Sequence, residues 1–303
     1  MNLEDLRTLV SIVEHGSLSA AARVKGVSQP SVTKQVQRME AELGLTLLVR
    51  GPKHPAELTP AGEQVVAFAR ETLSRLEALQ RGLAAMKTVG RGTLVLAAST
   101  IPGEYLLPGL LSSFRAEYPQ IQVEVTVTDT AEVVDRVLSD EADVGLIGSA
   151  IQRPGLRLER LVGDEILLIT PPKHPFSRRE RVTIGELSGQ AVILREAGSG
   201  TRRSVEAALA AAGLALPQAQ VSLTLGSTQA ILQAVEQGLG LGFVSARASA
   251  QAQADGHVAC VRLAGVDLHR DLYLAYLSRR ISDPLLARFL DFSHARFAEE
   301  AAQ

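Results

Sequence analysis

The spacing of apolar residues changes once along this 303-residue chain, near Gly92, and this change constrains the fold more than any other feature. Before Gly92, apolar residues recur at helical spacing. After it, short apolar runs alternate with helical stretches. A helical segment followed by a βαβ series predicts more than one domain, and the length of the chain predicts two or three.

One helix in the N-terminal part, Ser28 to Met39, separates its apolar and polar residues clearly. Its inner stripe consists of Val32, Val36, Met39 and Leu43. Its outer face consists of Gln29, Ser31, Thr33, Lys34, Gln37 and Arg38. Ser28 can cap the helix, and Pro30 is tolerated in a first turn, where N–H groups have no helical partner. Such a polar face suits a DNA major groove, although by itself it suits a solvated amphipathic helix equally well.

Two shorter helical stretches precede this polar helix. The first runs from about residue 2 to residue 15, ends at Gly16 and has Leu3, Leu6, Val10 and Val13 on its inner face. The second passes through residues 20–23, with Ser17 or Ser19 as its cap and Gly26 at its end. The turn 26–28 then leads into the polar helix. Two helices joined by a three-residue turn that contains glycine predict a helix-turn-helix.

A predicted hairpin and a long helix complete the N-terminal part. Two short apolar runs around the basic turn 51–55 predict a β-hairpin wing, in which Arg50 and Lys53 can touch phosphate. Thr59 and Pro60 then begin a helix that continues toward Lys87. Its heptad seam consists of Val65, Ala69, Thr72, Leu76, Leu79, Leu83 and Met86. We interpret this helix as a dimerisation helix; the alternative is packing against the chain's own C-terminal domain.

Charge is distributed unevenly along the chain. Residues 1–90 hold 11 Lys and Arg against 9 Asp and Glu, whereas the remaining residues hold 20 against 24. The local excess lies between residues 23 and 53 and favours a phosphate backbone as partner for the N-terminal part alone. The single cysteine, Cys260, excludes an intramolecular disulfide. Without a signal region or a long apolar run, we expect a cytoplasmic protein with no membrane partner.

The C-terminal part has the pattern of two α/β lobes. Strands are predicted over 93–98, 121–127, 144–147, 165–170, 192–194, 221–225, 241–245, 258–262 and 272–277, and helices over 104–117, 131–139, 201–212, 228–237 and 284–298. The first βαβαβ series implies a parallel sheet with right-handed crossovers. We expect lobe I over about 91–163 and 267–303 and lobe II over about 164–266, with the last helix returning to lobe I. Two such lobes with a cleft between them resemble the periplasmic-binding-protein fold.

Ligands in open α/β sheets sit beyond the C-terminal ends of strands, where helix N-termini present free N–H groups. The candidate effector-binding residues at these positions are Ser99, Thr100, Ile101, Thr128, Ser149, Ser199, Thr201, Arg202 and Ser227. Hydroxyls, glycine-rich backbone and arginines suit a sulfate-like, phosphate-like or carboxylate anion. The alternative is that these residues are ordinary caps and turns.

Several motifs together resemble the LysR-type transcriptional regulator family. They are Leu3-Glu4-Asp5-Leu6-Arg7-Thr8-Leu9-Val10, Gly16-Ser17-Leu18-Ser19-Ala20-Ala21-Ala22, Val27-Ser28-Gln29-Pro30-Ser31-Val32-Thr33-Lys34-Gln35, Glu42-Leu43-Gly44 and Leu58-Thr59-Pro60-Ala61-Gly62. The resemblance implies a winged helix-turn-helix domain over 1–58, a linker and dimerisation helix over 59–90 and a two-lobe effector-binding domain over 91–303. The family usually has an aromatic and an acidic residue before Arg50, where this chain has Leu48 and Val49.

The family resemblance also implies partners. They are double-stranded promoter DNA, further copies of the chain in a dimer or a homotetramer built as a dimer of dimers, a small co-inducer that changes DNA bending, and RNA polymerase. Carried over to matching positions, Gln29, Pro30, Ser31, Thr33 and Lys34 contact bases or phosphates, while Arg50 and Lys53 hold the DNA backbone. Arg38, on the exposed face of the same helix, is a further DNA-binding candidate.

Other functional classes fit the sequence less well. A cytoplasmic enzyme or a ligand-binding protein on a solute-binding scaffold leaves the helix-turn-helix and the long helix unexplained. The six histidines have no metal-ligand spacing, and Gly238-Leu239-Gly240-Leu241-Gly242 precedes a strand, where a dinucleotide fingerprint would follow one. We therefore expect no catalytic residues, no metal and no cofactor other than the co-inducer.

Overall fold

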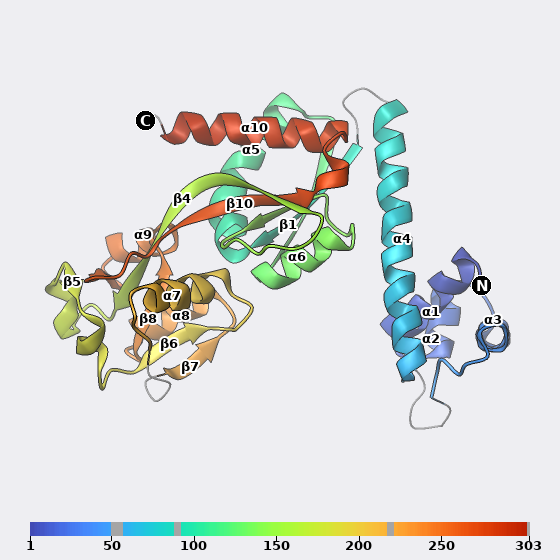
Figure 1. The fold of residues 1–303 in the computed structure, drawn as a ribbon, viewed down its shortest axis with the longest axis horizontal. Helices are drawn as coiled ribbons and strands as arrows, with labels where there is room; N and C mark the ends of the chain where they lie inside the picture. Colours follow the sequence, from blue (N-terminus) through green and yellow to red (C-terminus); the bar gives the residue numbers. More distant parts are fainter. Residues whose placement is uncertain (50–56, 88–91, 217–220, 302–303) are drawn as a thin grey trace. The chain divides into compact units, whose positions relative to one another are not determined.

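The computed structural model describes residues 1–49, 57–87, 92–216 and 221–301 (Figure 1). They form two compact units, residues 1–81 and 82–303. The first unit is helical, and the second is α/β. The predicted fold class, a helical helix-turn-helix with a long helix followed by a two-lobe α/β domain, is therefore confirmed.

The first unit is built on three helices, α1 (Leu3–His15), α2 (Leu18–Val24) and α3 (Gln29–Leu43). The Asn2 side chain caps α1, and Ser17, one of the two predicted caps, caps α2. The shared core consists of Leu9, Ile12, Ala21, Ala22, Val32, Val36, Met39, Leu47, Leu48 and Val66. Leu3 and Leu43, which we predicted to point inward, are exposed because each lies in a terminal turn beyond this core.

The wing is anchored at its base. Leu48 and Leu58 form an antiparallel bridge, and the Val49 N–H donates to the Glu57 carbonyl at 2.8 Å. The Thr59 N–H donates to the Leu47 carbonyl at 3.0 Å, which joins this base to the helix that follows. The predicted hairpin turn, with Arg50 and Lys53, lies outside the described residues.

The long helix α4 (Pro60–Lys87) begins as predicted, with the Thr59 hydroxyl accepting from the Gly62 N–H at 3.0 Å. Part of its predicted seam is used within its own unit, because Ala69 packs with Leu6 and Val10 of α1. Two large apolar side chains of this helix stay exposed: Phe68, outside the predicted seam, is 53% exposed, and the seam residue Leu79 is 58% exposed. The seam residues Leu83 and Met86 lie where side chains are not described.

The described residues of the second unit form ten strands and the helices that cover them. The strands are β1 (Gly92–Ser99), β2 (Ile121–Thr128), β3 (Val144–Ile147), β4 (Leu156–Thr170), β5 (Arg181–Val182), β6 (Val192–Arg195), β7 (Val221–Leu225), β8 (Leu241–Ser245), β9 (Ala259–Leu263) and β10 (His269–Leu277). Their order is β2-β1-β3-β10-β4-β8-β6-β7, with β9 beside β4 and β5 beside β9. β1 is parallel to β2 and β3, as predicted. β10 runs antiparallel to β3 and β4, so the sheet is mixed.

The helical segments of this unit are the π-helical turn η1 (Pro102–Leu106), α5 (Leu107–Glu117), α6 (Thr130–Leu138), η2 (Pro175–Arg178), η3 (Ile184–Leu187), α7 (Gly200–Ala211), α8 (Thr228–Glu236), α9 (Ala246–Ala254), η5 (Ser278–Arg280) and α10 (Pro284–Ala301). Lobe I denotes β1–β3, β10 and the first part of β4, and lobe II denotes the rest of β4 with β5–β9. α5 and α10 share one core with the lobe I strands, where Phe289 meets Phe114 edge to face at 5.4 Å. The last helix therefore packs on the lobe I strands.

Two long strands, β4 and β10, connect the lobes (Figure 1). β4 pairs with β10 from Leu156 to Glu165 and with β8 from Ile166 to Ile169. Both strands begin earlier than predicted, because their first residues carry charges that hide the alternation of a strand. Consequently Asp164 and Arg270, which we had not placed in strands, face each other as paired residues where β4 changes partner.

Candidate functional site

The start of α3 presents a polar surface. Ser28 caps the helix by accepting from the Ser31 N–H, and Pro30 occupies the first turn. Gln29, Ser31 and Lys34 are exposed, while Thr33 is half-buried and donates to the Gln29 carbonyl at 3.0 Å. The Gln29 side chain accepts from Ser19 of α2 at 2.9 Å, which fixes it at the junction of the two helices. These residues therefore share one accessible helix end.

A polar network holds α3 against α1. Asp5 is buried, and its carboxylate accepts from the Gln35 amide at 2.9 Å and from the Arg38 guanidinium. These hydrogen bonds and the Asn2 N–H outweigh burial and lower the pKa of Asp5 below its ordinary value. Arg38 thus has a structural partner, although 53% of its side chain is still exposed. Glu40, also buried, accepts from the Leu47 N–H at 2.8 Å and so ties α3 to the wing.

The second site lies between lobe I and lobe II. The residues that line it are Ser99, Thr100, Ile101, Asp129, Thr130, Gly148, Arg195, Ser199, Gly200, Thr201 and Arg270. They bring together the ends of β1 and β3 with the N-termini of α6 and α7, as the topology of parallel strands requires. The space left among them is about 10 Å³, room for at most one water molecule.

Arg195 reaches this cleft from the end of β6. Its guanidinium donates to both oxygens of Glu196, at 2.8 and 2.7 Å, and to the Thr228 hydroxyl at 2.8 Å. It also donates across the cleft to the Thr100 hydroxyl of lobe I at 3.3 Å. Burial raises the pKa of Glu104 in η1, and the positive charge of Arg195 partly offsets that rise. Arg195 is thus a buried cation that contacts both lobes.

Arg270 enters the cleft from β10. Its Nε donates to Asp164 Oδ2 at 2.9 Å, and its Nη1 donates to the Thr201 hydroxyl of α7 at 3.2 Å. The Asp164 side chain is fully buried, and its other oxygen accepts from Ser245 at 2.6 Å. Burial lowers the pKa of Arg270, and the Asp164 carboxylate opposes that change.

Buried polar atoms without hydrogen bonds lie in or beside the cleft. They include the hydroxyls of Thr130 and Ser149 and the Nη2 of Arg270, which lies 2.8 Å from Asp164 Oδ2 as an ion pair without hydrogen-bond geometry. Buried polar atoms that lack a hydrogen bond cost free energy in a folded protein, about 1–3 kcal/mol each. Together with the two guanidinium groups, they make the cleft suited to a small polar ligand that supplies acceptors.

Known families match both parts of the chain. Residues 3–63 match the bacterial regulatory helix-turn-helix protein, lysR family, and residues 87–298 match the LysR substrate binding domain. The chain belongs to the LysR family of transcriptional regulators. It is therefore a DNA-binding transcriptional regulator with an effector-binding domain, in a family of regulators rather than of enzymes.

Individual LysR regulators are similar over most of the chain. The HTH-type transcriptional regulator CysL of Bacillus subtilis is 33% identical over 245 residues, 81% of each chain. The structure of full-length CbnR complexed with its target DNA is 24% identical with a TM-score of 0.75, covering 97% of this chain and 99% of CbnR. The regulatory domain of CcmR from Synechocystis PCC6803, solved in complex with 2-PG, is 27% identical with a TM-score of 0.62, covering 68% of this chain and 97% of that domain.

The predicted effector residues of this LysR regulator separate into two groups. Ser99, Thr100, Ile101, Ser199 and Thr201 line the cleft. The others serve nearby elements: Thr128 donates to Glu132, Arg202 pairs with Glu206 and donates to the Arg195 carbonyl, Ser227 caps α8, and Ser149 lies beside Gly200 behind the lining. Placement after a strand thus identified some of the side chains that line the cleft.

Sequence reasoning missed Arg195 and Arg270 as site residues. Arg195 ends a buried strand and gives no local sign of its direction. Arg270 precedes the predicted strand 272–277, and its role depends on pairing with Asp164, 106 residues earlier in the chain. The one available signal was an arginine beside an apolar strand, a pattern that is most often a solvated strand end.

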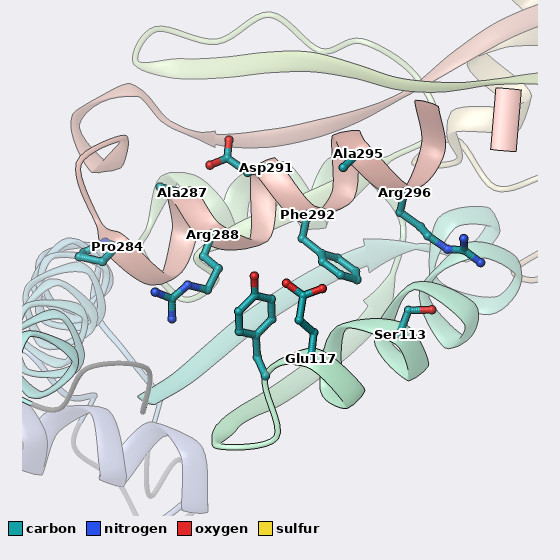
Figure 2. Close-up of a pocket in the computed structure, with 10 residues that line it drawn as sticks. Ser113, Glu117, Pro284, Ala287, Arg288, Asp291, Phe292, Ala295 and Arg296 are labelled. Atoms are coloured by element: carbon teal, nitrogen blue, oxygen red, sulfur yellow. The ribbon is translucent and has the colours of Figure 1, made fainter. Parts of the chain in front are cut away.

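A separate hollow of about 780 Å³ lies on lobe I between α5 and α10 (Figure 2). Phe292 points into it, and Arg288, whose guanidinium carbon stacks 5.2 Å from the Tyr118 ring centre, lies at its edge. Its lining carries Arg288 and Arg296 together with Glu117 and Asp291. The hollow contains none of the predicted effector residues.

Metal-binding clusters and membrane-spanning helices are both absent from the described part of the chain. Within those residues, no group of three or more His, Cys, Asp or Glu side chains is arranged to hold a metal ion. Within them also, no helix has the length and apolar character needed to cross a membrane.

Proposed function

We propose that this LysR regulator reads its operator with the start of α3 and responds to an anionic co-inducer bound between its lobes. The observation that carries the anion assignment is the convergence of two buried guanidinium groups, Arg195 and Arg270, on one narrow cleft. Buried arginines recognise carboxylate and phosphate groups well, because their planar donors match those oxygens.

For DNA, the proposed contacts are Gln29, Pro30, Ser31, Thr33 and Lys34. Their support is their shared position at one accessible helix end. Lys34 has no ion-pair partner among the described residues, so its charge is available to a phosphate. Arg38, already paired with Asp5, is proposed to steady α3 and to reach phosphate through its exposed part. Arg50 and Lys53 remain proposed backbone contacts of the wing.

For the effector, the proposed donors come from both lobes. The Thr100 and Thr201 hydroxyls each accept from an arginine, so each keeps its own hydrogen to donate to a ligand. Ser99 and Ser199 line the same cleft, and α7 adds the free N–H groups of its first turn. Each hydrogen bond to a charged ligand contributes about 1.5–3 kcal/mol. Sulfate-like, phosphate-like and carboxylate ligands all fit this chemistry, and the CcmR complex with 2-PG supports the same class.

Calorimetric titration of the full chain tests the proposal, with phosphate, sulfate, 2-PG and a neutral aromatic acid amide as ligands. Sulfate and phosphate also stabilise proteins without binding a site, so thermal shifts alone do not suffice. The matched variant is Arg195→Gln, which should weaken anion binding at least tenfold, as loss of one charge-assisted contact predicts. A footprint of the DNA upstream of the protein's own gene should change with the same anion. A response to the neutral ligand alone would overturn the anion assignment.

The assembly is also a proposal. Phe68 and Leu79 are eleven residues apart on α4, close to three helical turns, so they share one face. Large apolar side chains exposed on one stripe favour a second copy of the helix as partner. We assign residues 1–58 to DNA binding, 59–90 to a dimerisation linker and 91–303 to effector binding, with two dimers in a homotetramer. RNA polymerase is the further partner proposed at the promoter, and the cytoplasm is the proposed compartment.

A further inference from the structure

Hydrogen bonds from each lobe to the other close the cleft. Arg195 of lobe II donates to Thr100 of lobe I, while Arg270 of lobe I donates to Thr201 of lobe II. Each hydroxyl stands at the start of a helical segment of the opposite lobe. Two reciprocal hydrogen bonds therefore join the lobes across the site, each from an arginine on a strand to a hydroxyl at a helix start.

Glycines allow the lobes to approach this closely. A Cβ atom at Gly198 would lie 2.5 Å from Asp129 Oδ2, and one at Gly200 would lie 2.7 Å from the Thr130 hydroxyl oxygen. Asp129 cannot easily move, because its carboxylate caps α6 by accepting from the Glu132 N–H at 2.9 Å. Lobe II thus meets lobe I at two points where any side chain would act as a wedge.

The remaining space excludes the ligand class that the site favours. About 10 Å³ holds at most one water, whereas sulfate, phosphate or a carboxylate has several heavy atoms. An anion can reach the Nη2 of Arg270 and the Thr130 hydroxyl only if residues 198–201 move away from residues 129–130. The bound anion would then accept hydrogen bonds from the Nη2 of Arg270 and the Thr130 hydroxyl, which make none in this arrangement.

Arg270 lies at the junction of the strands that connect the lobes, so a movement of the lobes would change its contacts. It pairs with Asp164 across β4 and β10, the strands that connect the lobes, close to the point where β4 changes its partner to β8. Asp164 in turn accepts from Ser245 at the end of β8. The arginine that faces the cleft therefore also belongs to the junction about which the lobes would turn.

We propose that an anionic effector binds by separating the lobes, taking Arg270 from Thr201, so that binding and opening of the cleft are one event. This inference rests on the anion site proposed above. In this proposal the effector pushes residues 198–201 away from the opposite lobe, and the change reaches the paired strands β4 and β10.

Substitutions that wedge the lobes apart test it without removing a ligand group. Gly200→Ala and Gly198→Ala should each favour the open cleft, whereas Gly109→Ala on α5, where nothing lies within 4 Å, is the matched control. If the open form is about 10% populated, full opening lowers the apparent dissociation constant for phosphate about tenfold. Calorimetry with inorganic phosphate on the full chain measures this, and DNA footprints should shift toward the effector-bound pattern without phosphate.

A distance measurement on a chain that keeps both glycines tests the proposal even if both glycine variants misfold. Spin labels at Asp135→Cys and Ala207→Cys, both exposed, report the separation of α6 and α7 in a Cys260→Ala background. The distance should lengthen when phosphate is added.

The outcomes separate the two proposals. Phosphate that binds the wild type, with an unchanged or shorter label distance or with equal or weaker binding to folded wedge variants, overturns the inference and leaves the anion site standing. The inference is overturned in the same way if Gly109→Ala behaves like the wedge variants. If no anion binds the wild type, the anion site fails and this inference fails with it.

Discussion

Replacing Lys34 by alanine tests the assignment of α3 as the DNA-reading helix. Lys34 is exposed in the second turn of α3 and has no ion-pair partner among the described residues, so its removal leaves the core intact. A lysine that touches phosphate releases a counterion on binding, which makes affinity depend on salt. We therefore expect Lys34→Ala to weaken binding to every DNA sequence and to flatten that dependence.

The size of the effect follows from the number of copies on the DNA. Each lost phosphate contact lowers the slope of log affinity against log salt by about 0.9. Between 50 and 200 mM salt, the loss of affinity therefore becomes smaller by a factor of about 3.5 for each copy of the helix that contacts DNA. A dimer that places two copies of α3 should thus lose about 1.8 from its slope.

The assay is a fluorescence-anisotropy salt series with the DNA upstream of the protein's own gene and with an unrelated fragment. Arg7→Ala on α1 is the matched control, because it removes one exposed positive charge outside α3. Lys34→Ala should flatten the slope on both DNAs, whereas Arg7→Ala should leave it nearly unchanged. An unchanged slope for Lys34→Ala, or equal slopes for the two variants, would show that α3 does not face phosphate.

Three further outcomes are expected. Glu40→Ala should lower the free energy of unfolding of the first unit by about 1–3 kcal/mol in urea, because a buried N–H of the wing base loses its acceptor; Glu40→Gln keeps an acceptor and should cost less, and equal losses would contradict this. Burial and the hydrogen bond to Glu159 raise the pKa of Tyr276 to about 12. Its folded pKa is thus above the unfolded value of about 10, so its contribution to stability is complete below pH 10 and lost as pH rises toward 12. The difference in unfolding free energy between wild type and Tyr276→Phe should fall over that window, and a constant difference would refute the linkage. Leu79→Asp should weaken self-association in analytical ultracentrifugation, whereas Leu239→Asp, at a similarly exposed site of the second unit, should not; equal behaviour would remove α4 from the dimer interface.

Much of the fold could be predicted because its signals are local. Ser28 as cap, Pro30 in the first turn and the stripe of Val32, Val36 and Met39 specify α3 within a single segment. Among the strands of the second unit, the predicted bounds differ most from the structure at β4. Charged residues on this strand between the lobes remove the usual alternation. The heptad seam of α4 was predicted from spacing, yet Ala69 was taken by α1, because two partners can compete for one apolar stripe.

The sequence by itself determined the two-part organisation, the helix-turn-helix and the loops in which an effector site would lie. Each depends on residues within a few turns or on one strand followed by one helix. Only the tertiary structure decided which side chains face the cleft. Arg270 meets Asp164 106 positions away and Arg195 meets Thr100 95 positions away, through strand pairing and lobe contact. The register of strands and the approach of lobes depend on the packing of the whole domain, so no local pattern encodes them.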